Sequence, residues 1–168
     1  MERIETTAIR NLIHNEEYCR KVLPFIKEEY FIDRLEKLIF TEIYKFVNKY
    51  NNLPTKESLS IEMNTNKGVS EDEYKKMNEI ISSLNPEPIN LDWLVETTEV
   101  WCKDRAIHNA ILGGIQILDG KDKDHTPEYL PEMLSEALSV SFDQKVGHDY
   151  LLESKERYDY YNRKEERL

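Results

Sequence analysis

Glycine is scarce in this sequence, with five among 168 residues, and stretches that alternate apolar and polar residues are almost absent. Strands that are half buried show that two-residue alternation, and chains of strands need frequent glycine-containing turns. The two shortages together disfavour a sheet-based fold. We therefore expect an all-α protein.

Cysteine is equally rare. Cys19 and Cys102 are far apart in the sequence and have no histidine at zinc-ligand spacing, which excludes a disulfide framework and a zinc site. We expect two buried or partly buried thiols in a reducing compartment. No apolar run approaches the roughly 20 residues that cross a bilayer, and the first residues are too polar for a signal peptide. These absences predict a soluble, cytoplasmic protein without a membrane partner.

An excess of basic residues is also lacking, because the formal net charge is −10. An acidic chain repels phosphate backbones and is a poor candidate for binding DNA or RNA by itself. Lysine and arginine are interleaved with acids, as in "KEEYFIDRLEK", which is typical of a solvated helix surface.

What the sequence does contain is helical periodicity with clear helix ends. The strongest pattern covers residues 33–50, and Asp33 with Glu36 resembles a capping box at its start. Thr55 is expected to cap a short helix, and Ser70 with Glu73 forms a second capping-box signature. These signals predict a small globular helical bundle over residues 1–88.

A longer helix is predicted over residues 91–118, which would span about 42 Å if continuous. Gly113 and Gly114 each cost about 1 kcal/mol in a helix interior, a cost that close approach of another helix could offset. A polar turn follows, and Pro131 suits the first turn of a returning helix. We expect an antiparallel helical hairpin over residues 89–141, followed by a linker segment and helix over 142–168.

No motif for catalysis, a cofactor or a metal stands out. The stretch "GGIQILDGKD" fails as a phosphate loop because its spacing is wrong and Asp122 replaces the required hydroxyl residue. Asp104 and His108 can share a helix face, and we interpret them as a surface polar pair. An enzyme with an unrecognised all-α site remains an alternative, which a cleft around these two residues would favour.

Aromatic residues mark two places of interest. Trp93 and Trp101 are assigned to core or subunit packing, because they lack the basic flanks of a base-stacking platform. The cluster of Tyr158, Tyr160 and Tyr161 suits either a partner surface or a disordered tail.

Several motifs resemble one family when they are taken in order. They are "EEYFIDRLEKLIFTEIYKFVNKYNNLPT", "NLDWLVETTEVWCKDRAIHNAILGGI" and "LSVSFDQKVGHDYL" followed by a charged helix. Together they resemble the N-terminal domain of the DnaB-type hexameric replicative helicases of T-even-type bacteriophages. The similarity covers nearly the whole chain, from about Ile9 to Tyr161.

The resemblance implies a collar on the helicase ring, built from paired hairpins that close into a hexamer. It implies self-association, docking of primase and of a helicase loader, and contact with single-stranded DNA only through the full ring, in the cytoplasm of an infected bacterium. ATP and Mg²⁺ are implied only for a RecA-like motor, which this sequence does not include. We expect either a piece cut to the N-terminal domain or a natural motorless homologue.

Candidate interaction residues follow from the same resemblance. Trp101, Ile111, Ile115, Leu134 and Leu138 are candidates for the subunit interface. Leu151, Leu152, Tyr158 and Tyr161 are candidates for docking on the motor domain of a neighbouring subunit. The alternative within this picture is a free-standing all-α adaptor, such as a helicase loader or a mimic of the collar.

Overall fold

The computed structural model describes residues 2–142, and within that range it contains helices and no β-strand. The prediction of an all-α fold is confirmed. The α-helices are α1 (Ile4–His14), α2 (Glu16–Val22), α3 (Arg34–Tyr50), α4 (Lys56–Asn64), α5 (Glu71–Ser83), α6 (Leu91–Leu118) and α7 (Leu130–Leu138). Three short 3₁₀ helices lie between them, η1 (Leu23–Phe25), η2 (Glu28–Tyr30) and η3 (Pro127–Tyr129).

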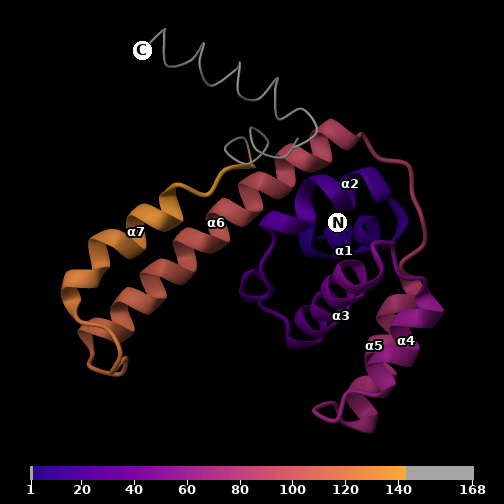
Figure 1. Ribbon diagram of the computed structural model, residues 1–168, viewed down its shortest axis with the longest axis horizontal. Helices are drawn as coiled ribbons and strands as arrows, with labels where there is room; N and C mark the ends of the chain where they lie inside the picture. Colours follow the sequence, from indigo (N-terminus) through magenta and orange to yellow (C-terminus); the bar gives the residue numbers. More distant parts are fainter. Residues whose placement is uncertain (1, 143–168) are drawn as a thin grey trace, which may run out of the picture.

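The helices α1 to α5 form a bundle, and α6 with α7 projects from it (Figure 1). The core of the bundle is a single apolar cluster to which each of these five helices contributes. Its most completely buried side chains include Leu12, Tyr18, Ile39, Ile43 and Met77. Burial of this apolar surface is the main force that holds the bundle together.

Side-chain caps fix where several helices begin. Complete capping boxes are formed by Thr55 with Ser58 and by Ser70 with Glu73. The capping box at Ser70 was predicted from the sequence. At Thr55 only the cap was predicted. Pro24 lies in η1, so the second helix is short, as expected from the ring's incompatibility with a helix interior.

The capping box predicted for Asp33 and Glu36 is only half right. The Asp33 carboxylate accepts the N–H groups of Leu35 and Glu36, and so it caps α3. The Glu36 side chain does not return to Asp33. It turns inward, where it accepts from the Arg3 guanidinium and from the Thr6 hydroxyl. Burial raises the pKa of Glu36 more than Arg3 lowers it.

The helix α6 serves both parts of the molecule. Over its first half, Leu94, Trp101 and Cys102 belong to the same core as the bundle, and α6 contacts both α1 and α2. Its second half packs against α7 (Figure 1). The boundary predicted between residues 88 and 89 therefore falls in a connecting loop, whereas the core of the bundle continues across it.

The chain returns to the bundle after α7. Phe142 is buried and stacks on Phe25, with 4.6 Å between the ring centroids. The Phe142 backbone N–H donates to the Glu99 carboxylate at 2.6 Å, and the Ser141 hydroxyl donates to the same carboxylate. The hairpin is thus attached to the bundle at both of its ends.

Candidate interaction surface

The projecting pair of helices is held together along its inner side by small residues. A Cβ atom added at Gly114 would lie 3.0 Å from Leu130 Cδ2, and one added at Gly113 would lie 3.7 Å from Met133. Ala110 and Ile117 of α6 and Ala137 of α7 are also buried. The expected close approach of another helix is confirmed at Gly114, whereas Gly113 leaves room for a methyl group.

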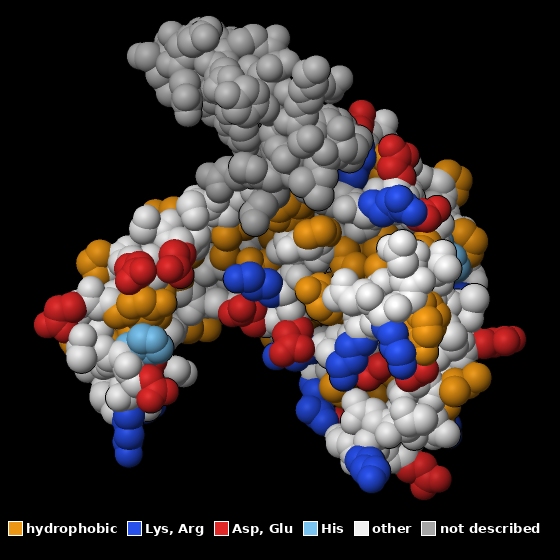
Figure 2. All heavy atoms as spheres, viewed as in Figure 1, with side chains coloured by type: hydrophobic (Ala, Val, Ile, Leu, Met, Phe, Trp, Pro, Cys, Tyr) orange, Lys and Arg blue, Asp and Glu red, His pale blue; other side chains and the backbone are white. Residues whose placement is uncertain are grey.

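The outer side of this pair exposes large apolar side chains. We call the exposed aliphatic side chains of α6 and α7 beyond residue 110 the hairpin apolar residues. They are between 38 and 66 % exposed and comprise Ile111, Leu112, Ile115, Leu118, Leu134 and Leu138. Figure 2 shows hydrophobic side chains at the surface along the hairpin, next to acidic ones. So many exposed aliphatic side chains on so few turns are unusual for a surface that stays in water.

Four of the predicted interface residues belong to this set, namely Ile111, Ile115, Leu134 and Leu138. Their role at an interface stays a prediction. Leu112 and Leu118 were missed, although both are as exposed as the others. A helical wheel of residues 110–118 could have found them, because the helix is apolar on more than one side there.

Trp101 requires a correction. It is only 7 % exposed, and its ring makes edge contacts with Tyr30 and Phe31 at centroid distances of 6.1 and 5.0 Å. Leu94, seven residues earlier on α6, is buried in the same core. Trp101 is therefore a core residue of its own chain and has little surface to offer a second copy.

The connection between α6 and α7 is ordered by polar contacts. The Asp122 carboxylate accepts the backbone N–H groups of Asp124 and His125, and it also contacts the His125 ring at 2.9 Å. These interactions, with that of His125 first, lower the pKa of Asp122. Gly120 has a φ of 76°, which is the conformation that lets a glycine end α6.

Catalytic arrangements are not supported by the placement of the titratable groups. Asp104 and His108 are both exposed on α6, and within residues 2–142 no hydrogen bond joins them. The stretch that was tested as a phosphate loop lies at the end of α6 and in the following turn. No group of three His, Cys, Asp or Glu side chains in residues 2–142 is arranged to hold a metal ion.

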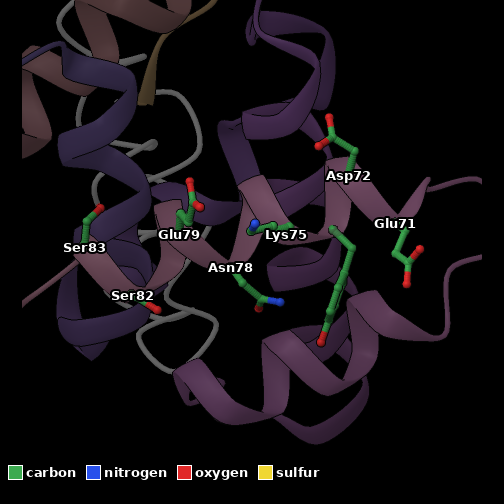
Figure 3. A pocket seen from close by; sticks show the side chains of 8 residues that line it. Glu71, Asp72, Lys75, Asn78, Glu79, Ser82 and Ser83 are labelled. Carbon is green, nitrogen blue, oxygen red and sulfur yellow. The ribbon is translucent and has the colours of Figure 1, made fainter.

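A broad concave surface lies along α5 and is polar. Glu71, Asp72, Lys75, Asn78, Glu79, Ser82 and Ser83 line it together with Tyr74. Figure 3 shows that these side chains are spread along one helix and do not converge on a common point. Tyr74 and Asn78 instead bind the Ser60 hydroxyl of α4, which ties the two helices together. This surface lacks the convergent groups of an active site.

Both thiols are buried, as expected. Burial raises the pKa of Cys19 to about 11 and also raises the pKa of Cys102. A thiol that stays protonated at neutral pH is a poor nucleophile and a poor metal ligand. No helix among residues 2–142 is both long enough and apolar enough to cross a membrane.

The candidates for docking on a motor, Leu151, Leu152, Tyr158 and Tyr161, lie outside the residues that the structure describes. The described part of the chain ends at Phe142, against the bundle core. Any role of the four residues stays a prediction.

Comparison with known proteins gives one informative relative, and no family model matches the chain. A DnaB-like replicative helicase of Enterobacteria phage T4 is 32% identical over 151 residues, which cover 85% of this chain. This chain is related to a DnaB-like replicative helicase. It spans about a third of that protein's length, because the match covers 32% of the T4 helicase. The resemblance stated from the sequence motifs is confirmed.

Proposed function

We propose that this chain acts as the collar domain of a replicative hexameric DNA helicase. In this role it pairs with other copies through the hairpin apolar residues and supports assembly of the ring. The observation that carries the proposal is the exposed aliphatic surface of a projecting hairpin in a relative of a phage helicase. Burying such surface between two copies is favourable by the same effect that folds the core.

The collar would also form part of a primosome, where it docks primase and the helicase loader. Holding primase close to the ring raises its effective concentration without requiring tight binding. ATP-driven unwinding, with ATP and Mg²⁺, belongs on this proposal to a motor region of the helicase and not to residues 2–142. The place of action is the cytoplasm of an infected bacterial host.

The acidic surplus supports a collar that does not grip DNA. With a net charge of −10, the domain offers phosphate groups little attraction. Single-stranded DNA would then be contacted only by the complete ring. A collar without affinity for the strand does not oppose its movement through the ring.

The test measures binding of the chain to its proposed partners by fluorescence anisotropy. We expect binding to the cognate primase and none to labelled single-stranded DNA between about 50 and 200 mM salt. Steeply salt-dependent binding to the DNA, with no binding to primase, would contradict the collar role. The primase alone serves as the positive control for the DNA, since it must contact the template.

A further inference from the structure

The second half of α6 projects from the bundle. A small cluster of hydrogen bonds lies at the point where the helix leaves the bundle. Cys102 is the last residue of α6 that is fully buried in the bundle core, and beyond it Ala106 packs against that core while only partly buried. Arg105 and Asn109 follow, one turn apart on the same side of α6. Arg105 Nε donates to the Tyr30 backbone carbonyl at 2.9 Å, and Asn109 Nδ2 donates to the Glu29 carbonyl at 2.9 Å.

The two side chains also hold each other. Arg105 Nη2 donates to Asn109 Oδ1 at 3.1 Å, so each fixes the rotamer of the other. Beyond Asn109, no hydrogen bond runs from α6 to the bundle within the described part of the chain. The pair is therefore the last polar connection along α6 before the hairpin projects into solvent.

The acceptors belong to a short element that is anchored in the bundle core. The carbonyls of Glu29 and Tyr30 end the 3₁₀ helix η2, and helix-end carbonyls lack partners within their own helix. The backbone bonds in this segment go to the carbonyls of Lys27 and Glu28 instead. Tyr30 is buried against Trp101, which anchors η2 in the core. A bond to η2 is thus a bond to the body of the bundle.

Space is present beside this connection. A groove of about 230 Å³ separates η2 from the hairpin. Its lining comes from the bundle and from both hairpin helices: Lys27, Glu29, Tyr30, Ala106, Asn109, Ala110, Met133, Glu136, Ala137 and Val140. Because packing does not fill the space between η2 and α7, packing alone does not fix how far the hairpin leans toward the bundle on this side.

We infer that Arg105 and Asn109 are positioning residues that set the angle between hairpin and bundle by binding the two end carbonyls of η2. From Arg105 to the end of α6 the helix is about 20 Å long, so a rotation of about 10° moves its tip by about 3 Å. Pairing of hairpins in a closed ring requires a defined angle, and in this respect the inference rests on the proposed function. The angle itself is a property of the single chain.

The test follows the angle through the distance between two spin labels, measured by double electron–electron resonance. The labels are attached at Lys49→Cys on the bundle and Lys123→Cys on the hairpin. Both positions are exposed, and the native thiols are buried, so the labels go to the new cysteines. Labelled protein is diluted into unlabelled protein so that only distances within one molecule are observed. The parent should give a single narrow distance.

Two variants release the contact in different ways. Arg105→Met keeps the length of the side chain but removes its donors, and Asn109→Asp keeps its shape but removes the N–H that Glu29 accepts. Each should shift or broaden the distance distribution, while circular dichroism shows the parent's helicity. Arg105→Lys retains one donor and should restore part of the parent distribution. The matched controls Lys103→Met and Gln116→Glu lie on the same helix, their side chains form no hydrogen bond to the bundle within residues 2–142, and they should match the parent.

The inference is overturned if Arg105→Met and Asn109→Asp both keep the parent distribution, because packing would then set the angle. Should Arg105→Met fail to fold, the milder Asn109→Asp decides alone. Self-association of the unlabelled proteins is measured separately. If the two variants alter the spin-label distance but the parent never self-associates, the proposed function is contradicted. The positioning role of Arg105 and Asn109 would still stand.

Discussion

At the scale of single residues, the most completely buried polar contact joins the bundle to α6. The Tyr18 hydroxyl and the Thr98 hydroxyl lie 2.7 Å apart, and neither residue is exposed. Thr98 Oγ1 also contacts the Leu94 carbonyl at 2.7 Å, so it can donate there while it accepts from Tyr18. Tyr18 has no other partner for its proton among the described residues.

This asymmetry predicts unequal effects of two substitutions. Tyr18→Phe leaves Thr98 bonded to Leu94 and should lower the free energy of unfolding by about 1 kcal/mol. Thr98→Val leaves the buried Tyr18 hydroxyl without a hydrogen-bond partner and should lower the free energy of unfolding by about 2–3 kcal/mol. The double variant should be more stable than Thr98→Val alone. Urea denaturation measures all three, and equal effects of the two single changes would contradict the assignment of donor and acceptor.

The thiols give a second prediction at this scale. Since burial raises the pKa of Cys19 to about 11, neither thiol should react with a disulfide reagent at pH 8 until the chain unfolds. A colorimetric thiol assay with and without denaturant checks this. Rapid reaction of the folded protein would show that the bundle opens far more readily than its buried core indicates.

The same shifts determine how stability depends on alkaline pH. The folded-state pKa of Cys19 lies above its ordinary value of 9, so the folded chain holds its proton where the unfolded chain has lost it. Stability should be complete below pH 9 and decline as the pH rises toward 11. Burial also raises the pKa of Tyr30 from 10 to about 12, which extends the decline. Cys19→Ala should make the decline between pH 9 and 11 shallower, and Cys102, whose pKa burial also raises, should keep part of it.

At the scale of the elements, the hairpin glycines allow a matched pair of substitutions. A methyl group at Gly113 meets Met133 at an ordinary contact distance of 3.7 Å, whereas at Gly114 it meets Leu130 at 3.0 Å. Gly113→Ala should therefore stabilise the chain by up to about 1 kcal/mol through helix propensity. Gly114→Ala should gain less, because Leu130 must move. Chemical denaturation of both variants measures the difference, and a larger gain at Gly114 would contradict the packing.

The elements also show how far the sequence could predict the structure. The end of α6 was predicted because a polar turn follows Leu118, and the structure shows that Asn90, which was not singled out, caps its start. The start of α5 was predicted from Ser70 and Glu73, whose capping interactions are local in the sequence. Local signals of this kind carry the prediction of helices.

What could not be predicted depends on contacts between distant residues. The partners of Arg105 and Asn109 are backbone carbonyls 75 and 80 residues away, and a backbone carbonyl leaves no mark in a sequence. The Glu36 carboxylate likewise turns to Arg3, 33 residues earlier. The sequence left Trp101 between core and subunit packing, because periodicity shows that a face is apolar but not which neighbour covers it.

At the scale of the whole molecule, one part buries its apolar residues and the other exposes them. The bundle has a complete core, which the first half of α6 shares. The hairpin apolar residues remain uncovered in the single chain. The account therefore assigns stability to the bundle and association to the hairpin, and it predicts that substitutions in the hairpin apolar residues change association more than folding.

The most direct measurement is the solution mass of the chain across protein concentration, by sedimentation equilibrium, for the parent and two variants. Ile115→Glu places a charge among the hairpin apolar residues, and Ile61→Glu places one on α4, where the isoleucine is 65% exposed. The account predicts that the parent and Ile61→Glu form dimers reversibly and that Ile115→Glu weakens this by at least about tenfold. A parent that stays monomeric at every concentration, or equal effects of the two charges, would contradict it.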